Sequence, residues 1–452
     1  MIDRFHHLSR RRAPARVVVA LLAALIPPVT GCGLAAGSAG ARSAVAARAS
    51  GEAQSASRYP VGASRPLVHV SPRALARVAA RRRAATRTPG RTRRKAAKPV
   101  LRGNPARARL AFQAMQKQYY LPGTGLYAGE PFSYLWPFSQ ALAATVSVAN
   151  VPALKASMVR ELQARLVGLQ AYLDTNNSGA PEGTYASTLP AFDGTIGPPV
   201  GPGGPKYYDD NDWVGIELVR IYKLTRNTTA LAQAEQVMAF EMAGWQTSPE
   251  LGCPGGIPFS NSVENTDRNT VTTAPAAELA VQLYRVTGNQ QYLAFAEMAY
   301  AWVRNCLLQP SGLYADHVDS HGVAEITFWS YNQGTMIGAG TLLYQATGNP
   351  SYLAQARQTA NAALAYFTGE MLGAEIPFFP AVYFRNLLYL DAVTHDPPGN
   401  RIVQSYVDYA WQNLRLSNDM FVAGAPPSGQ LLVQSAIVQM YALLSSPPST
   451  YF

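Results

Sequence analysis

The sequence predicts an all-α protein folded as an (α/α)6 barrel, and three observations support this fold class. Apolar residues recur with the helical period from about residue 105 onward. These periodic stretches number about twelve. A short motif recurs along them at intervals of 62 and 60 residues. Six helix pairs, each spanning about 60 residues and closed into a ring, would account for all three observations.

The recurring motif marks the turn between the two helices of a pair. It begins at Tyr222, Tyr284 and Tyr344, and its second and third copies end in Thr-Gly-Asn. Glycine readily adopts the left-handed conformation that follows the end of a helix. Each repeat is therefore predicted to be a helix, a tight turn and an antiparallel helix.

The expected helices follow in chain order. They cover residues 105–119, 131–149, 153–174, 207–225, 228–245, 270–287, 290–308, 330–347, 350–371, 378–393, 398–416 and 428–445. The periodicity indicates no strand, although it would miss short strands within the long loops.

The first 106 residues differ from the rest of the chain in charge. They contain 21 Lys and Arg and two acids, a net charge of +19, whereas residues 107–452 carry a net charge of −8. The predicted folded part is therefore acidic, which argues against a nucleic-acid-binding protein. We predict a signal peptide at 1–32, a disordered basic linker at 33–104 and a barrel domain at 105–452.

The N-terminal 32 residues are typical of an export signal. Basic residues between Arg10 and Arg16 precede an apolar run at 17–26, which is too short to span a bilayer. Cys32 follows in the sequence Val-Thr-Gly-Cys, which resembles a bacterial lipobox whose cysteine is lipidated. An ordinary secretory signal with a chance cysteine is the alternative. Either signal predicts an exported protein, anchored at the membrane or cell surface or otherwise secreted.

The predicted linker is rich in Ala, Ser, Arg, Gly and Pro and holds few apolar residues that could form a core. This composition predicts disorder. The basic run between Arg73 and Lys98 could rest on anionic lipid or cell-wall polymer, and a simple solvated linker is the alternative.

Three long loops should place three helix starts on one rim of the barrel. The short turns join helices at one face, so the loops at 175–206, 246–269 and 309–329 must lead to helix starts on the other face. Long loops on a rigid scaffold often carry function. Polar and aromatic residues gather at these helix starts, or on the other helices that begin at the same rim because they alternate along the chain with helices of opposite direction. Beside Asp209 and Asp210, we predict that the residues of this group line a cleft and bind the substrate; they are Trp136, Tyr207, Tyr208, Asn211, Trp213, Asn269, Trp329, Tyr331, Asn332, Gln333 and Arg385.

Asp209 and Asp210 are the candidate catalytic pair. Acids in the first turn of a helix are common, because the exposed N–H groups and the helix dipole favour negative charge there. Two adjacent carboxylates among aromatic rings also suit glycoside hydrolysis, where one attacks the sugar and the other transfers protons. Neighbouring helical residues have Cβ atoms about 5 to 6 Å apart, near the roughly 5 Å carboxyl separation of retaining enzymes. Repulsion would raise the pKa of one carboxyl, which would then be the acid.

Four motifs, in the family's order, make the chain resemble glycoside hydrolase family 76. They are YYDDNDW at 207–213, GGIPFSNSVENTDRNT at 255–270, WSYNQG at 329–334 and FFPAVYFRNL at 378–387. The resemblance covers about 107–445 and implies a retaining endo-α-1,6-mannanase on an (α/α)6 barrel, cutting mannan-type polysaccharide without a required metal or other cofactor. By position, Asp209 would be the nucleophile and Asp210 the acid/base. The residues matching cleft-lining positions would be Asn269, Tyr331, Asn332, Gln333 and Arg385.

Other residues leave alternatives open. Cys253 and Cys306 could pair after export or remain two buried thiols. The acids of the segment 316–321, which also holds two histidines, could bind a cation, and a solvated loop is the simpler interpretation. We expect a monomer with no nucleic-acid partner.

Two further functions stay open beside the hydrolase hypothesis. A glycan-binding surface lipoprotein could use the same barrel without turnover, although the intact aspartate pair argues against it. A sugar epimerase is the other alternative, and such enzymes usually need histidines that face the cleft, which no inner helix start carries.

Overall fold

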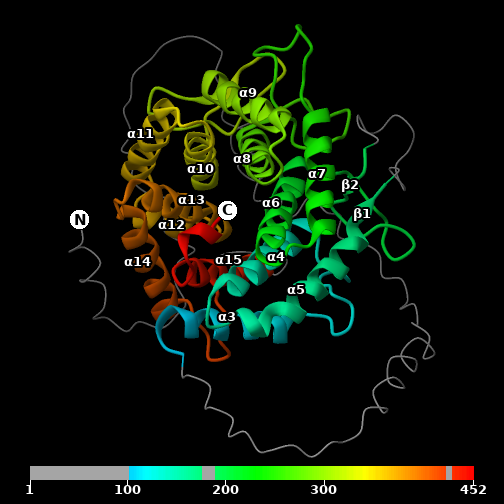
Figure 1. Cartoon of the computed structure of the whole chain (residues 1–452), viewed down its shortest axis with the longest axis vertical. Helices are drawn as coiled ribbons and strands as arrows, with labels where there is room; N and C mark the ends of the chain where they lie inside the picture. Colours follow the sequence, from blue (N-terminus) through cyan, green and yellow to red (C-terminus); the bar gives the residue numbers. More distant parts are fainter. Residues whose placement is uncertain (1–100, 176–188, 424–429) are drawn as a thin grey trace, which may run out of the picture. The chain divides into compact units, whose positions relative to one another are not determined.

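A computed structural model of the chain describes residues 101–175, 189–423 and 430–452. These residues contain thirteen α-helices, twelve of which form an (α/α)6 barrel (Figure 1). The fold class predicted from the sequence is thus confirmed. The predicted signal peptide, Cys32 and nearly all of the predicted linker lie outside these residues. Among the described helices, none is long and apolar enough to cross a bilayer.

Six helices form the inner ring of the barrel. They are α4 (Leu135–Asn150), α6 (Tyr208–Thr225), α8 (Thr270–Thr287), α10 (Ser330–Thr347), α13 (Phe378–Thr394) and α15 (Gln430–Leu443). Each inner helix packs against the next, and α15 packs against α4, which closes the ring. These helices are rich in small and apolar residues and are buried on almost every side, as expected for helices enclosed by others.

Six helices surround this ring. They are α3 (Gly103–Tyr119), α5 (Lys155–Leu169), α7 (Thr228–Ala243), α9 (Gln290–Leu307), α11 (Pro350–Tyr366) and α14 (Pro398–Asn413). Helix α3 packs against α15, and each of the others packs against the inner helix that precedes it in the chain. The outer helices bury one face only, because their other face is polar and solvated.

Two predicted helices give way to other secondary structure before their predicted ends. The helix predicted at 350–371 is divided, because α11 ends at Tyr366 and a separate short helix, α12 (Gly369–Ala374), follows. The helix predicted at 153–174 ends at Leu169 and continues as a 3-10 turn and the strand β1 (Leu173–Asp174). Apolar periodicity misses both changes, since local backbone hydrogen bonds at helix ends leave the spacing of apolar residues unchanged.

The start predicted at 131 is four residues early, because α4 begins at Leu135. This start places Pro137 in the first turn of the helix, where its missing N–H has no helical partner to lose.

Short strands link the long loops at the rim of helix starts. Strand β1 pairs with β2 (Ala191–Phe192) in an antiparallel ladder. Strand β4 (His317–Val318) lies between β3 (Arg268–Asn269) and β5 (Ala324–Glu325), also antiparallel. The second sheet therefore joins the loop that leads into α8 to the loop that leads into α10.

The repeated turns adopt the predicted conformation. Arg226, Gly288 and Gly348 follow three helix ends with φ angles of 62°, 76° and 73°. The asparagine after each of them caps the next helix with its side-chain oxygen. In the second repeat, Asn289 Oδ1 accepts a hydrogen bond of 3.0 Å from the backbone N–H of Gln291. The same Thr-Gly-Asn sequence thus ends one helix and begins the next.

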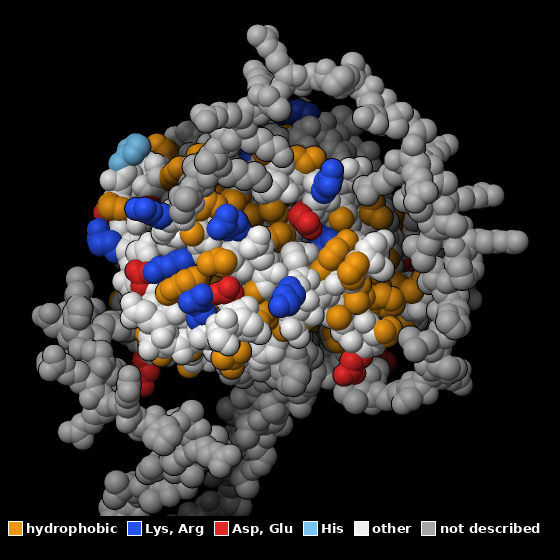
Figure 2. Space-filling model, turned by 90° about the horizontal axis from the view of Figure 1, so that it is seen from below, with side chains coloured by type: hydrophobic (Ala, Val, Ile, Leu, Met, Phe, Trp, Pro, Cys, Tyr) orange, Lys and Arg blue, Asp and Glu red, His pale blue; other side chains and the backbone are white. Residues whose placement is uncertain are grey.

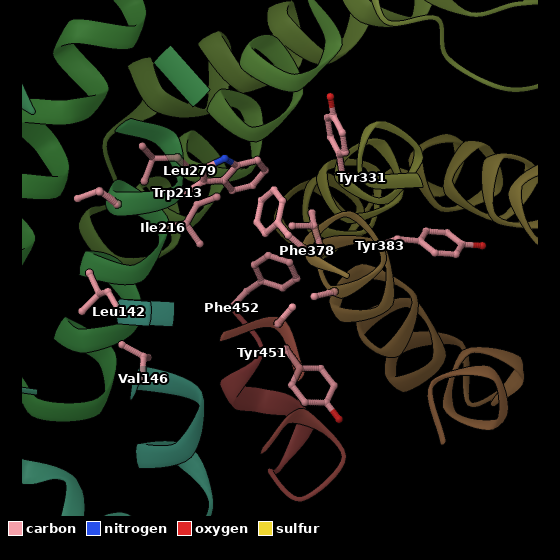
Figure 3. Packing of buried hydrophobic residues seen from close by; sticks show 14 of the residues in the cluster. Leu142, Val146, Trp213, Ile216, Leu279, Tyr331, Phe378, Tyr383, Tyr451 and Phe452 are labelled. Carbon is pink, nitrogen blue, oxygen red and sulfur yellow. The ribbon is translucent and has the colours of Figure 1, made fainter. Parts of the chain in front are cut away.

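Residues 447–452 enter the barrel from the end opposite the helix starts, beyond α15 (Figure 1). Tyr451 and Phe452 are buried, and the Phe452 ring lies 4.9 Å from Tyr389 and 4.8 Å from the Arg385 guanidinium. Figure 3 shows Phe452 among apolar side chains between the inner helices. The C-terminal residues therefore help to fill the interior of the barrel.

On the face shown in Figure 2, Lys and Arg side chains of the described residues lie among acidic and hydrophobic ones.

Candidate active site

The start of α6 is held rigidly by the loops around it. Tyr207 is extended (φ −89°, ψ 132°) and pairs with Ser260 in an isolated β-bridge. The next N–H, of Tyr208, donates a 3.1 Å hydrogen bond to the Phe259 carbonyl. The helix then begins with Asp209 in its first turn. The backbone that carries the candidate pair is therefore fixed before the helix starts.

A buried ion cluster holds the residue that precedes this segment. Lys206 is fully buried, and its Nζ lies 2.8 Å from Asp174 Oδ2 and 3.6 Å from Asp193 Oδ1. Asn261 Oδ1 accepts a 2.9 Å hydrogen bond from the Lys206 backbone N–H. Buried charges of this kind persist only when paired, so the cluster ties the loop that precedes Tyr207 to the strand β1.

Asp209 and Asp210 share one polar environment at the start of α6. Asp210 is 4% exposed and Asp209 is half-buried. One oxygen of each carboxyl, Oδ1 of Asp209 and Oδ2 of Asp210, is buried and has no hydrogen-bond partner among the described residues. Burial, followed by the charge of Asp209, holds the pKa of Asp210 well above the usual carboxyl range. Burial also raises the pKa of Asp209. The pair therefore keeps a proton at a pH at which an exposed aspartate would already be ionised.

Asp316 joins the starts of α8 and α10 to the pair. Its backbone carbonyl accepts a 2.9 Å hydrogen bond from the Thr270 N–H, and its side chain contacts Asn332 Nδ2 at 3.4 Å and His317 Nδ1 at 2.8 Å. The charge of Asp316 adds to the burial that raises the pKa of Asp209. The predicted site residue Asn332 therefore contacts Asp316, which in turn lies close enough to Asp209 to act on its pKa.

Asn269 sits at the same rim, on β3 opposite His317. It is 6% exposed, and its Oδ1 has no hydrogen-bond partner within the described part of the chain. A buried acceptor of this kind is suited to a hydroxyl group of a bound molecule.

Aromatic side chains from four inner helices meet at the start of α13. Trp136 and Trp213 pack edge-on against Phe378, with ring centroids 5.4 and 5.9 Å away. Trp329 and Tyr331 pack against Phe379 at 5.4 and 4.3 Å. Figure 3 shows the rings of Trp213 and Phe378 turned toward each other. Flat apolar faces of this kind bind the C–H surfaces of sugar rings.

Tyr208 lies outside this arrangement. Its side chain is 1% exposed and stacks on Phe240 of α7, with centroids 4.4 Å apart and planes 13° apart. The ring therefore packs between the inner and outer helices. The predicted role in substrate binding is replaced by one in packing.

Two amides predicted to line the cleft hold backbone instead. Asn211 is fully buried, accepts from the Phe192 N–H at 2.8 Å and donates to the carbonyls of Phe192 and Tyr207. Gln333 accepts from the Tyr314 N–H at 2.8 Å and donates to the Tyr314 carbonyl at 3.0 Å. Each amide clamps the loop that leads into its own helix, so both positions support the rim.

Arg385 lies deeper in the barrel than the predicted cleft. It is 5% exposed, and its Nη1 donates a 2.9 Å hydrogen bond to Glu217 Oε1. Its guanidinium stacks on the Phe452 ring. The ion pair and the stacked ring occupy this side chain in the barrel interior, which corrects its predicted place at the cleft.

The loop that carries Asp319 is a structured turn. The Asp319 side chain accepts hydrogen bonds from the backbone N–H groups of His321 and Val323 at 2.9 and 2.8 Å. Within the described residues, no group of three His, Cys, Asp or Glu side chains has an arrangement that could hold a metal ion. Close by, a disulfide joins Cys253 to Cys306, whose Cα atoms are 6.2 Å apart, and ties the loop before α8 to the end of α9.

The sequence does not predict three groups of residues that the structure places at the site. Asp316 was considered only as part of a possible cation loop, and Lys206 has no motif of its own. Phe378 and Phe379 belong to the FFPAVYFRNL motif at a predicted inner-helix start, which is a signal that could have identified them.

Comparison with known proteins agrees with this geometry. The family model described as glycosyl hydrolase family 76 matches residues 106–385. A mannan endo-1,6-alpha-mannosidase, DCW1, of Candida glabrata is 30% identical over 129 residues, which are 26% of this chain and 29% of the relative. The DCW1 of Saccharomyces cerevisiae is 30% identical over 124 residues, 25% of this chain and 28% of the relative. The match thus spans under a third of the length of either relative.

Solved structures share the fold. A family 76 glycoside hydrolase from a bovine Bacteroides thetaiotaomicron strain superposes with a TM-score of 0.66 at 23% identity, covering 76% of this chain and 77% of the other. An inactive variant of an α-1,6-mannanase from Salegentibacter, with two consecutive aspartates changed to asparagine, is bound to α-1,6-mannotriose. It superposes with a TM-score of 0.61 at 23% identity, covering 76% of this chain and 99% of the other. Since the family model covers more than half of the sequence, the chain belongs to glycosyl hydrolase family 76.

Proposed function

We propose that the protein is a retaining glycoside hydrolase that cleaves internal α-1,6-mannosidic bonds of a mannan-type polysaccharide. The observation that carries this proposal is the adjacent pair Asp209 and Asp210 at the rim of the barrel, both with raised pKa and both with a buried, unpaired oxygen. The relatives named as mannan endo-1,6-alpha-mannosidases support the choice of bond.

The proposed mechanism is a double displacement. Asp209 attacks the anomeric carbon while Asp210 donates its proton to the leaving oxygen, and a mannosyl ester forms on Asp209. Asp210, now ionised, then takes a proton from a water molecule that attacks the ester, and Asp209 is released. The raised pKa of Asp210 fits the acid role, because the carboxyl must still be protonated when the glycosidic bond breaks.

The aromatic residues at the start of α13 form the proposed sugar-binding wall. The rings of Trp136, Trp213, Trp329 and Tyr331 approach Phe378 or Phe379, and the carboxyls of Asp209 and Asp210 lie on the same rim. Stacking of sugar rings on this wall would orient the chain across the pair. Asn269 and Asn332 are proposed to bind sugar hydroxyl groups beside it, and Tyr207 is proposed to border the site.

The product configuration tests the double displacement. The protein is incubated with linear α-1,6-mannan and with α-1,2- and α-1,3-linked mannans as controls, and the first products are followed by proton NMR. We expect oligosaccharides from the α-1,6 polymer only, with an α-anomeric reducing end that mutarotates afterwards. Initial β-anomers would contradict the retaining mechanism, and equal cleavage of all polymers would contradict the linkage.

We also propose that the protein works outside the cytoplasm as a monomer, either lipid-anchored through Cys32 or secreted. When the full chain is produced in a bacterium that lipidates exported proteins, we expect Cys32→Ala to move it from the membrane fraction to the medium if the cysteine is lipidated. An unchanged membrane fraction would contradict anchoring by Cys32.

A further inference from the structure

His317 lies at the rim of helix starts and has no part in the proposed mechanism. It is on β4, the middle strand of the sheet, directly opposite Asn269 of β3 and Glu325 of β5. Side chains of directly opposed residues lie on the same face of an antiparallel sheet. Backbone pairing on both sides therefore holds the His317 ring beside Asn269, which is proposed to bind a sugar hydroxyl group.

Both ring nitrogens of His317 face a carboxylate. Nδ1 lies 2.8 Å from Asp316 Oδ2, and Nε2 lies 3.6 Å from Asp267 Oδ2. Glu325 adds a third acid on this face of the sheet. A neutral imidazole carries a proton on one nitrogen only, whereas the imidazolium can donate from both. Burial by itself would lower the pKa of His317, but the Asp316 hydrogen bond and the charges of the three acids raise it overall. The surroundings therefore favour the protonated ring.

Asp316 carries a negative charge that reaches the candidate pair. It is 1% exposed, and both of its carboxyl oxygens have partners, because Oδ1 accepts from Asn332 Nδ2 at 3.4 Å and Oδ2 contacts the His317 ring. A buried carboxyl with donors on both oxygens can remain ionised. Next to burial, the charge of Asp316 is a cause of the raised pKa of Asp209. This charge therefore opposes the proposed mechanism, in which Asp209 must be ionised to attack.

The other acids that face Asp209 are neutral. Asp210 is the proposed acid and holds its proton. Asp212 of α6 and Glu241 of α7 are fully buried, and none of their carboxyl oxygens has a hydrogen-bond partner among the described residues. Burial, before any neighbouring charge, holds the pKa of both well above the usual carboxyl range. Asp316 is thus the neighbour whose charge acts on Asp209.

We propose that the imidazolium of His317 offsets the charge of Asp316 and so keeps Asp209 ionised for attack. His317 is a positioning residue, because it acts on Asp209 through Asp316 and takes no part in the bond exchange. This role rests on the proposed function, in which Asp209 is the nucleophile. Arg268 of β3 is also close, but it faces Asp267, so the cation in contact with Asp316 is His317.

The acid limb of the pH profile of kcat/KM on linear α-1,6-mannan reports the ionisation of Asp209. His317→Gln removes a positive charge, so the limb should move to higher pH by about half a unit. Asp316→Asn removes the opposing charge and should move the limb to lower pH. The double variant should resemble Asp316→Asn, because the charge that His317 offsets is then absent. His317→Lys keeps a positive charge and should restore the wild-type limb.

His321→Gln is the matched control, because His321 is an exposed histidine on the same loop, and it should leave the profile unchanged. A purely structural role of His317 would lower kcat at every pH without moving the limb. An acid limb that stays in place in folded His317→Gln, or that moves to lower pH, would overturn the proposal.

NMR titrations of the full chain, with isotope labels in the histidine rings and aspartate carboxyls, test the same contacts without substrate. Both ring nitrogens of His317 should remain protonated above about pH 6.5, the usual midpoint of histidine, and Asp316→Asn should lower this midpoint. His317→Gln should raise the midpoint of Asp209.

A His317 ring that is neutral at about pH 6.5, or a midpoint of His317 that Asp316→Asn leaves unchanged, sinks the proposal even if His317→Gln fails to fold. An unchanged midpoint of Asp209 in folded His317→Gln contradicts it as well. Because these titrations need no turnover, they separate failure of the role of His317 from failure of the proposed function.

Discussion

Asn211 shows how one side chain at the rim can matter without touching substrate. It is fully buried, and its amide satisfies both the N–H and the carbonyl of Phe192, a residue that is itself fully buried. A third hydrogen bond reaches the carbonyl of Tyr207, the residue directly before α6. Removing the amide would leave buried backbone groups unsatisfied, which costs more than the hydrogen bonds contribute.

We expect Asn211→Ala to lower the free energy of unfolding by at least about 2 kcal/mol. Urea denaturation of the variant measures this loss. Asn227→Ala is a matched control, because Asn227 caps α7 in a solvent-accessible turn, and its loss should cost only about 1 kcal/mol. Equal losses in the two variants would show that Asn211 contributes no more than an ordinary helix cap.

For single residues, the sequence indicates which residue types lie at the rim better than it indicates where their side chains point. It placed Asp209, Asp210, Asn269 and Tyr331 at one rim, and the structure places them there. It could not show that Tyr208 points away, since neighbouring residues at a helix start diverge by about 100° and both aromatic and acidic types fit either face. The role of Arg385 was also hidden, because its partner Glu217 lies 168 residues away in the chain.

The turns that follow α8 and α10 each connect an inner helix to an outer helix of the barrel. Gly288 and Gly348 hold φ angles of 76° and 73°, and a Cβ added at either would meet no heavy atom within 4 Å. An added methyl group therefore costs free energy only through the left-handed backbone.

We expect Gly288→Ala and Gly348→Ala each to destabilise the protein by about 1 kcal/mol. The two losses should add, because a Cβ added at either glycine meets no heavy atom within 4 Å, so the two substitutions have no contact partner in common. Gly373→Ala, in the short helix α12 with equally open space but no positive φ, should be neutral or stabilising. Chemical denaturation compares the wild type, the three single variants and the Gly288→Ala/Gly348→Ala double variant, and a similar loss in Gly373→Ala would refute the backbone explanation.

Element positions were well predicted where apolar periodicity was long, as in α8 and α10, whose ends match the prediction. The prediction failed where hydrogen bonds between loops decide the structure. The strands β3, β4 and β5 have two residues each, and their pairing depends on contacts between distant loops that no local pattern records.

The molecule as a whole buries many acids, and this sets its expected response to pH. Burial raises the pKa of Asp193 to about 7, that of Glu375 to about 7 and that of Glu278 to about 8. Unfolded carboxyls titrate near pH 4, so the folded protein holds protons that the unfolded chain has released. The resulting stabilisation is fully present below about pH 4 and is lost as pH rises through about 7 to 8.

We therefore expect the melting temperature to fall between pH 5 and pH 8, as measured by calorimetry. Glu278→Gln should flatten this fall, because the amide stays neutral at every pH. A melting temperature that rises across this range, or an identical slope in the variant, would contradict the assignment of these buried protons.

The disulfide contributes to the same stability. Cys253 and Cys306 close a loop with a sequence separation of 53, and removing such a link typically costs about 2 to 5 kcal/mol. We expect the Cys253→Ser/Cys306→Ser double variant to melt at a lower temperature than the oxidised protein, and reduction of the wild type to have a similar effect. An unchanged melting temperature would show that the link adds no stability.

The central claim is that Asp209 and Asp210 together cleave an α-1,6-mannosidic bond. The most direct measurement is reducing-end release from linear α-1,6-mannan by the full chain, by Asp209→Asn and by Asp210→Asn, with folding verified by circular dichroism. The account predicts turnover by the wild type and a loss of at least about a thousandfold in each variant, since each removes one of the two groups on which the displacement depends. Near-wild-type release by either folded variant would contradict it.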